Sequence, residues 1–266
     1  MAFLQRLHSQ PAVLVRVEAV SGSAPREAGA WMAVFAEGQI GTVGGGQLEW
    51  DCLRQARLHL ARFPGEPHPP AWRRRMALGP SLGQCCGGAM ELAFEPVDHG
   101  DIERLRQDLR PARRALALFG GGHVGQAIVR ALRDLPFALT WIDSRDEIFP
   151  PELQPGIQCE HSDPVHRAVD SLPADSLVLI MSFSHAEDLD IVACCLQRRR
   201  ASQDLPFVGL IGSRTKWTVF RRRLRERGFS DAELDGITCP IGLPGIRGKE
   251  PAVIAASVAA QLLMTC

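Results

Sequence analysis

Two adjacent cysteines lie within the glycine-rich segment Gly83-Gln84-Cys85-Cys86-Gly87-Gly88. Glycines give such a loop unusual torsion angles and leave its backbone N–H groups exposed. N–H groups of this kind lower the pKa of a thiol, and a thiolate is both a nucleophile and a ligand for soft metals. A disulfide between neighbouring cysteines would be strained. We therefore expect one reactive thiol with a helper, and two inert cysteines buried in a turn are the alternative.

A second glycine-rich segment, Gly120-Gly121-Gly122-His123-Val124-Gly125, follows a short apolar run and has the spacing Gly-x-Gly-x-x-Gly. In this pattern the first glycine permits a tight turn, the second admits a phosphate to the backbone, and the third lets helix and strand pack closely. Asp143 ends the next strand, where an acidic side chain holds a ribose hydroxyl in dinucleotide-binding folds. The pattern predicts a Rossmann-like fold. It leaves open whether a ligand binds or the turn only packs. The candidate binding residues are Gly120, Gly122, His123, Gly125 and Asp143.

A third glycine-rich turn precedes a helical segment that carries Glu49. The free N–H groups at the start of a helix attract anions, so Gly44, Gly45, Gly46 and Glu49 are candidate binding residues. Ordinary turn geometry explains these glycines equally well.

Two further candidates follow apolar runs in the second half of the chain. Ser184 and Glu187 have the spacing of a helix capping box, which does not account for the intervening His185. We therefore treat His185 as a candidate catalytic residue, because ligands of open α/β sheets bind where strands end. Gly212 and Ser213, after the next apolar run, are candidate binding residues for the same reason.

The composition is that of an ordinary globular protein of 266 residues, with 45% apolar and 23% charged side chains. Thirty basic and thirty acidic residues cancel, which argues against a nucleic acid or a membrane surface as a partner. The first ten residues do not have the pattern of a signal peptide, and no apolar run reaches the roughly 18 residues of a membrane span. The eight cysteines do not resemble a secreted disulfide framework and include no Cys-x-x-Cys pair. We expect a cytoplasmic protein with reduced thiols.

Hydrophobic periodicity divides the chain into two parts with a boundary in residues 100–114, which we place between domains 1–110 and 111–266. The first part is β-rich, with strands expected at 13–20, 31–36, 39–43, 73–78 and 89–94 and one helix at 47–63. In the second part, strands near 116–119, 141–143, 177–181 and 207–211 alternate with helices that end near 135, 198, 227 and 263. This alternation predicts a parallel sheet with right-handed crossovers. The expected fold class is α/β, with an N-terminal α+β domain followed by a Rossmann-like domain.

These turns predict one binding cleft. The loops of the Rossmann-like domain end on the same sheet edge, and the cysteine loop belongs to the other domain. A large anionic ligand that also carries a soft metal or a sulfur atom would use both halves.

The motifs together resemble the XdhC/CoxI family, the accessory proteins of molybdenum hydroxylases such as xanthine dehydrogenase. The resemblance covers nearly the whole chain. It rests on the three glycine-rich segments above and on Gly22-Ser23-Ala24-Pro25-Arg26, the segment 207–213 with Lys216, and Cys239-Pro240-Ile241-Gly242-Leu243-Pro244-Gly245. The paired cysteines and the last of these segments look like the xanthine dehydrogenase branch of the family.

The resemblance implies a chaperone that binds molybdenum cofactor (molybdopterin) and holds it while the molybdenum gains a terminal sulfur from a cysteine desulfurase. The chaperone then inserts the cofactor into apo-xanthine dehydrogenase, an enzyme of purine catabolism. The family's cysteine motif corresponds here to Cys85 and Cys86, together with Gly87 and Gly88. We hypothesise that Cys86 contacts the metal or its terminal sulfur and that Cys85 assists. Many relatives have a cysteine at the position of Gln47, so a thiol is absent there in this chain. We also expect a homodimer.

Three other functions remain open from the sequence. One is an NAD(P)-dependent oxidoreductase, or another nucleotide-binding protein, that uses the Gly120 turn and Asp143. Another is a sulfurtransferase that carries a persulfide on Cys85 or Cys86. The last is a scaffold that bridges a desulfurase and the apo-enzyme, which predicts partner binding that survives loss of both cysteines.

Overall fold

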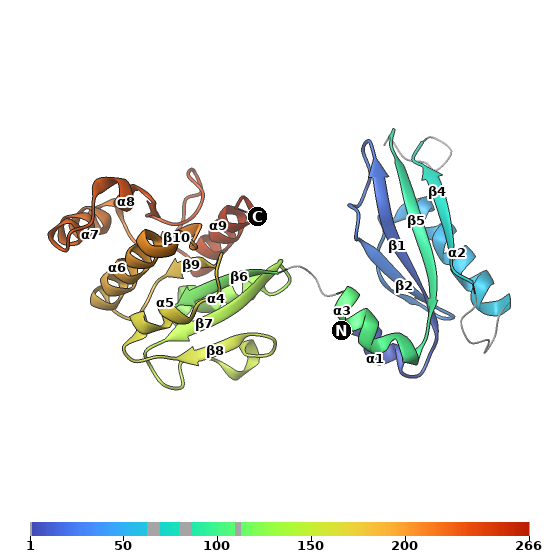
Figure 1. Cartoon of the computed structure of the whole chain (residues 1–266), viewed down its shortest axis with the longest axis horizontal. Helices are drawn as coiled ribbons and strands as arrows, with labels where there is room; N and C mark the ends of the chain where they lie inside the picture. Colours follow the sequence, from blue (N-terminus) through green and yellow to red (C-terminus); the bar gives the residue numbers. More distant parts are fainter. Residues whose placement is uncertain (1, 63–69, 80–86, 110–112, 266) are drawn as a thin grey trace. The chain divides into compact units, whose positions relative to one another are not determined.

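The computed structural model describes residues 2–62, 70–79, 87–109 and 113–265. The chain forms two compact units, Met1–Arg110 and Pro111–Cys266 (Figure 1). Each unit has its own sheet and its own hydrophobic core. Cys85 and Cys86 lie outside the described residues, so the expectations about their chemistry stay predictions.

The N-terminal unit is built on a five-stranded antiparallel sheet with the strand order β3-β2-β1-β5-β4. Its strands are β1 (Ala12–Ser21), β2 (Trp31–Phe35), β3 (Gln39–Gly41), β4 (Trp72–Ala77) and β5 (Ala89–Val97). The central strand β1 pairs on both sides, and Val15 lies opposite Met32 of β2 and Phe94 of β5. Each strand overlaps a segment for which the sequence predicts one.

Side chains alternate between the two faces of this sheet. Val13 and Val15 belong to the core beneath α2 (Gly46–Arg62), whereas Leu14 belongs to the core beneath two shorter helices. Those helices are α1 (Ala2–Leu7) and α3 (Ile102–Asp108), the latter preceded by the 3₁₀ turn η2 (His99–Asp101). The helix α2 follows the expected period, since Leu48, Cys52 and Ala56 are all buried.

The C-terminal unit is built on a parallel six-stranded sheet with the order β11-β10-β9-β6-β7-β8. Its strands are β6 (Arg114–Phe119), β7 (Phe137–Asp143), β8 (Gln158–His161), β9 (Leu177–Ile180), β10 (Phe207–Leu210) and β11 (Ile237–Thr238). We number the strands 1 to 6 in chain order, from β6 to β11. Read across the sheet from β8 to β11, their order is 3-2-1-4-5-6, which is that of a doubly wound Rossmann sheet. The direction of winding reverses between β6 and β9, and ligands of such sheets bind at the carboxyl ends of the strands beside this reversal.

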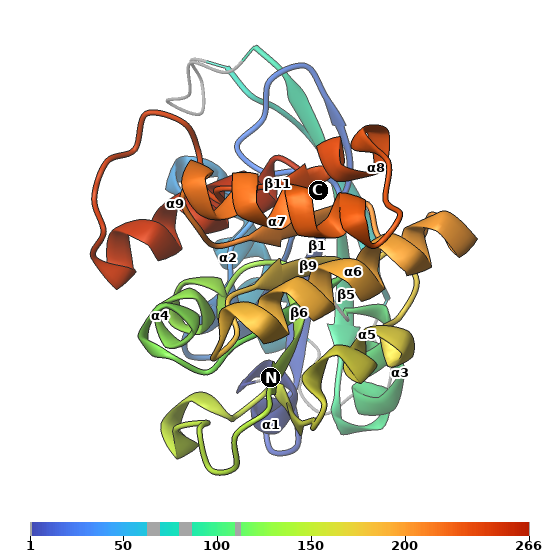
Figure 2. The same cartoon turned by 90° about the vertical axis from the view of Figure 1, so that its left-hand side faces the viewer.

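Helices cover both faces of the parallel sheet. Alternate residues of β6 face opposite sides, because Leu116 and Leu118 pack with α4 and α9 while Ala117 and Phe119 pack with α6 and α7. Figure 2 looks onto the face covered by α6 and α7. The helices and 3₁₀ turns are α4 (His123–Leu132), η3 (Pro151–Leu153), η4 (Val165–Arg167), α5 (Ala168–Ser171), α6 (His185–Ser202), α7 (Arg214–Glu226), α8 (Asp231–Asp235) and α9 (Pro251–Leu263).

The expected fold class is therefore confirmed, with a Rossmann-like parallel sheet after an α+β unit. The helix expected to end near residue 198 continues to Ser202, and the short edge strands β8 and β11 and the helix α1 were not predicted. Within the described part of the chain, no helix has the length and apolar character needed to cross a membrane.

A buried ion pair links the helices α6 and α7, which follow the strands β9 and β10 of the C-terminal unit. Lys216 Nζ in α7 lies 2.6 Å from Asp188 Oδ2 in α6 and donates to the carbonyl oxygen of Ile211 at 2.9 Å. The other oxygen of Asp188 accepts from the backbone N–H and the hydroxyl of Ser182, both at 2.8 Å. Only 10% of the Lys216 side chain and 3% of the Asp188 side chain are exposed. One pair therefore holds the carboxyl ends of β9 and β10 to the helices that follow them.

We expect Lys216→Met to reduce the free energy of unfolding of the C-terminal unit by about 3–5 kcal/mol, because it leaves the buried carboxylate of Asp188 uncompensated. Urea unfolding measures the loss, and native-state hydrogen exchange of the β9 and β10 amides assigns it to this unit. Lys249→Met, at an exposed position, is the matched control and should stay within about 0.5 kcal/mol of wild type. Equal losses in the two variants would show that the ion pair does not hold these strands.

Candidate functional site

The glycine turn after β6 lies at the reversal of the C-terminal sheet. Gly120 has a φ of +124°, and a Cβ atom there would lie 2.1 Å from the carbonyl oxygen of Met181, which follows β9. A Cβ atom on Gly125 would lie 2.0 Å from the carbonyl oxygen of Gly120. These two glycines are thus required by close backbone packing. Gly122 differs, since no described part of the chain lies within 4 Å of its Cβ position, and it is exposed at the start of α4 beside His123. The turn leaves open space where a phosphate meets a helix N-terminus.

Asp143 holds this turn from the end of β7. Its side chain is 1% exposed, and its Oδ2 accepts a hydrogen bond from the backbone N–H of Gly121 at 2.6 Å. The carboxylate also accepts from the backbone N–H of Arg145 and from two guanidinium nitrogens of Arg145, all at 2.9 Å. Burial alone would raise the pKa of Asp143, but the hydrogen bonds from Arg145 and Gly121 outweigh it and lower the pKa. A ribose hydroxyl at this carboxylate would have to displace one of these donors.

The loop after β9 places its polar residues differently from the expected capping box. Ser184 caps α6 by accepting from the backbone N–H of Glu187 at 3.2 Å. The side chain of Glu187 does not return to Ser184 and instead accepts from the hydroxyl of Ser144 at 2.7 Å. His185 is exposed, and its ring contacts Phe220 edge-on with 6.3 Å between the ring centroids. A catalytic role for His185 stays a prediction.

Gly212 and Ser213 lie after β10 at the same carboxyl edge of the sheet. Ser213 caps α7 by accepting from the backbone N–H of Lys216 at 3.1 Å, and a Cβ atom on Gly212 would lie 2.7 Å from Lys216 Cδ. Both residues thus support the lysine that pairs with Asp188. The sequence reasoning missed Asp188 at this edge, because the residue stands next to an ordinary cap and its partner lies in another crossover.

In the N-terminal unit, a carboxylate of α2 itself binds backbone N–H groups of the turn that precedes this helix. Gly44, Gly45 and Gly46 have φ values of +130°, +72° and +62°. The carboxylate of Glu49 accepts from the backbone N–H groups of Val43 at 3.1 Å and Gly45 at 3.2 Å. It also accepts from the Gln39 amide at 2.7 Å and from the Thr42 hydroxyl. Burial would raise the pKa of Glu49, but these hydrogen bonds lower it overall. An external anion would compete with this internal one.

Three motifs of the N-terminal unit meet at one end of its sheet. A Cβ atom on Gly88 would lie 2.3 Å from the carbonyl oxygen of Ser23, and one on Gly44 would lie 2.5 Å from Cγ of Pro25. The segment Gly22–Arg26 therefore touches both the turn before α2 and the end of the cysteine loop. Gly87 and Gly88 are described, whereas the two cysteines directly before them are not. The glycines fix the place at which the cysteine loop rejoins the sheet.

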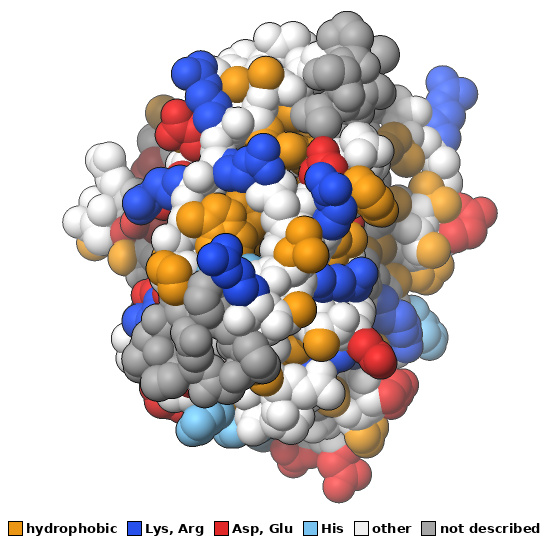
Figure 3. Space-filling model, turned by 90° about the vertical axis from the view of Figure 1, so that its right-hand side faces the viewer, with side chains coloured by type: hydrophobic (Ala, Val, Ile, Leu, Met, Phe, Trp, Pro, Cys, Tyr) orange, Lys and Arg blue, Asp and Glu red, His pale blue; other side chains and the backbone are white. Residues whose placement is uncertain are grey.

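One further surface of this unit combines apolar and basic side chains. On α2, Trp50 is 54% exposed and Leu58 is 63% exposed, and the guanidinium of Arg54 lies 5.3 Å from the centroid of the Trp50 ring. Figure 3 shows hydrophobic side chains interspersed with basic ones on this side of the unit, and the basic side chains of this unit other than histidine are all arginines.

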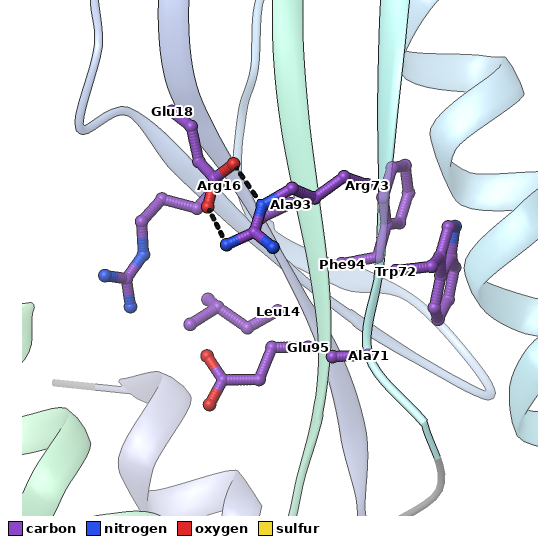
Figure 4. A pocket seen from close by; sticks show the side chains of 9 residues that line it. All are labelled: Leu14, Arg16, Glu18, Ala71, Trp72, Arg73, Ala93, Phe94 and Glu95. Atoms are coloured by element: carbon purple, nitrogen blue, oxygen red, sulfur yellow. Dashed lines mark hydrogen bonds and ion pairs between the residues drawn. The ribbon is translucent and has the colours of Figure 1, made fainter.

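A hollow of about 250 Å³ lies on the opposite side of the antiparallel sheet (Figure 4). Arg73 and Glu18 line it and form a bidentate ion pair, in which Nε and Nη2 of Arg73 lie 2.7 and 3.0 Å from the two carboxylate oxygens of Glu18. None of the site residues predicted from the sequence lines it. Within the described ranges, no group of three or more His, Cys, Asp or Glu side chains is placed to hold a metal ion.

The fold and the turns define a two-unit α/β protein whose C-terminal unit is a Rossmann-like domain with an open glycine turn at its sheet reversal. A family model described as the XdhC Rossmann domain matches residues 116–262, and one described as the XdhC and CoxI family matches residues 6–65. The chain belongs to the XdhC and CoxI family, as the resemblance of its motifs predicted.

Two known proteins show how far this likeness extends. The uncharacterized protein YqeB of Escherichia coli (strain K12) is 32% identical over 260 residues, which are 95% of this chain and 43% of that protein. The chain thus spans less than half the length of this curated relative. A Bacillus halodurans protein, whose crystal structure is described as that of a xanthine dehydrogenase, is 20% identical with a TM-score of 0.78. The match covers 99% of this chain and 94% of that one, and it shows the fold.

We expect Gly88→Ala to destabilise the N-terminal unit by about 2–3 kcal/mol, because the added methyl group meets backbone oxygens that cannot move independently. Gly87→Ala is the matched control, since no atom of the described residues lies within 4 Å of its Cβ position, and it should change stability by less than about 0.5 kcal/mol. Chemical unfolding of both variants tests the contact. Equal stability of the two variants would contradict it.

We expect acid to remove the stabilisation that Asp143 provides. Its pKa is lowered in the folded state, so the contribution is complete above the unfolded value of about 3.9 and is lost as the pH falls through the folded value. Asp143→Asn should therefore be less stable than wild type at pH 7, and the difference should narrow below about pH 4. Unfolding free energies measured from pH 7 to pH 2 test this, with the exposed Asp134→Asn as control. A difference that is constant with pH would assign the loss to packing.

Proposed function

We propose that this chain is an accessory protein that binds molybdenum cofactor as its cargo, supports its sulfuration and delivers it to apo-xanthine dehydrogenase. Membership of the XdhC and CoxI family supports an accessory role in xanthine dehydrogenase maturation. The observation that carries the proposal is the open position at Gly122, the N-cap residue of α4 at the sheet reversal, where none of the described atoms lies within 4 Å of the Cβ position. The phosphate of the cofactor suits such a helix start.

The cysteines within the described residues are poorly suited to sulfur chemistry, which supports assigning that chemistry to Cys85 and Cys86. All five of them are free thiols whose pKa is raised by burial. Burial raises the pKa of Cys52 and Cys195 to about 12 and that of Cys239 to about 11. A thiol that stays protonated at neutral pH is a poor nucleophile and a poor metal ligand. We therefore assign the contact with molybdenum or its terminal sulfur to Cys86, with Cys85 in support and a cysteine desulfurase as the sulfur donor.

The geometry favours this cargo over a nicotinamide dinucleotide. The carboxylate that would hold a ribose hydroxyl is already filled by Arg145 and Gly121. The turn itself stays open at Gly122. This arrangement suits a ligand that presents a phosphate to the turn and needs no ribose contact at Asp143.

We expect wild-type protein to retain molybdenum cofactor through a desalting column and Cys86→Ala to retain at least tenfold less, because the mutant lacks the soft ligand. Cofactor in the protein fraction is quantified by its molybdenum and pterin content, and circular dichroism confirms that the variant is folded. Cys159→Ala, which removes a partly buried thiol of raised pKa, is the matched control and should retain the cofactor fully.

Equal retention by wild type and Cys86→Ala would remove Cys86 from the site. Retention of nicotinamide dinucleotide alone, tested in parallel, would make the protein an oxidoreductase candidate and overturn the accessory role. Transfer is tested by adding apo-xanthine dehydrogenase, which should gain activity only from the loaded protein.

A further inference from the structure

An exposed aromatic ring stands at the sheet reversal of the C-terminal unit. Phe183 lies in the loop after β9, across the reversal from the Gly120 turn, and is 66% exposed. The guanidinium carbon of Arg145 lies 4.6 Å from the centroid of this ring. Because two bonds to Asp143 fix that guanidinium, the phenyl ring is supported although it faces solvent. A supported, exposed ring is a surface on which a planar heterocycle stacks.

A buried acceptor without a donor lies in the same loop. Oε1 of Glu187 accepts from the Ser144 hydroxyl at 2.7 Å, but Oε2 is buried and has no hydrogen-bond partner among the described residues. Leaving a buried charged acceptor unsatisfied is costly, so native proteins rarely keep one without a reason. The sequence offers Glu187 a local partner in the capping box, and the fold does not use it. A ligand that brought N–H donors would satisfy this oxygen.

The stacking ring, the acceptor and the glycine turn belong to one framework. Asp143 accepts from Gly121 of the turn at 2.6 Å and also fixes Arg145 beneath Phe183. Ser144, between them in the chain, holds Glu187. A ring stacked on Phe183 therefore lies beside strands β6, β7 and β9, whose ends also position the open Gly122.

We propose that this framework is a recognition site for a phosphorylated ring with a 2-amino-4-oxopyrimidine edge. This edge, shared by pterins and guanine, carries a ring N–H beside an amino group, and two adjacent donors match the two oxygens of a carboxylate. Phe183 stacks on the ring, Glu187 accepts from its edge, and the turn at Gly122 takes the phosphate. Adenine instead presents a ring nitrogen acceptor beside its amino group, which the carboxylate repels. The proposal deepens the proposed function, in which the occupant is the pterin of the cofactor, and rests on it for that identification.

Isothermal titration of the full chain with guanosine 5′-monophosphate and adenosine 5′-monophosphate tests the site with available probes. We expect guanosine monophosphate to bind at least tenfold more tightly. Glu187→Gln should abolish this preference, because an amide opposes one of the two donors with a donor of its own. Phe183→Ala should weaken both nucleotides about tenfold and Phe183→Tyr should preserve both, since stacking tolerates any aromatic ring. Glu152→Gln, at an exposed position, is the matched control and should leave both affinities unchanged.

Equal binding of the two nucleotides, binding of neither, or a preference that survives Glu187→Gln overturns the site. Thermal unfolding of each variant shows whether a lost affinity reflects a lost fold, and Glu187→Asp provides a second test because it keeps the charge but shortens the reach. A cofactor arm separates this proposal from the proposed function. If wild type and Glu187→Gln retain molybdenum cofactor equally, the site fails and the function stands. If wild type prefers guanosine monophosphate but does not retain cofactor, the function fails and the site serves a guanine nucleotide.

Discussion

The glycine turn of the C-terminal unit depends on one buried carboxylate. Asp143 is nearly inaccessible to solvent, yet it stays charged because Gly121 and Arg145 donate to both of its oxygens. Burying a charge is costly unless its hydrogen bonds are satisfied, and here the donors belong to the glycine turn and to Arg145. The same carboxylate that neutralises Arg145 also fixes the turn. Asp143 is therefore better understood as a residue that positions the glycine turn than as one that is free to accept from a ribose.

The glycine turns of the two units differ in how many of their backbone N–H groups are hydrogen-bonded to a carboxylate of the protein. Before α2, the carboxylate of Glu49 collects two backbone N–H groups of the turn, so the fold supplies its own anion. Before α4, Asp143 takes the N–H of Gly121, and open space adjoins the Cβ position of Gly122. Because the N–H groups of the first helical turn have no partner within the helix, an outside anion is favoured only where the fold does not fill the place. Of the two turns, the one before α4 is therefore the one that suits the anion in our proposal.

The features that the sequence predicts well are those set by local constraints. Glycine at 125 follows from a backbone contact within the motif, with the carbonyl oxygen of Gly120, whereas glycine at 120 is also required by Met181 after the neighbouring strand β9. The apolar, β-branched run from Val13 to Val20 likewise predicts a strand, and the structure places Val13 and Val15 in one core and Leu14 in the other. The edge strands β8 and β11 were missed because four and two residues carry too little pattern. The pairing of Asp188 with Lys216 was missed because its partners, 28 residues apart, meet only through the sheet.

Glu187 shows why the binding site itself was less predictable than the fold. A serine followed three residues later by a glutamate predicts a reciprocal cap, and the local bond from Glu187 N–H to Ser184 does form. The carboxylate instead accepts from the hydroxyl of Ser144, 43 residues away, which follows β7 at the same edge of the sheet. A local motif and a tertiary contact compete for one side chain, and the tertiary contact wins without satisfying both oxygens. A carboxylate with one unsatisfied oxygen is the departure from a local rule on which the proposed binding site rests, since a fully satisfied carboxylate would have nothing left to offer a ligand.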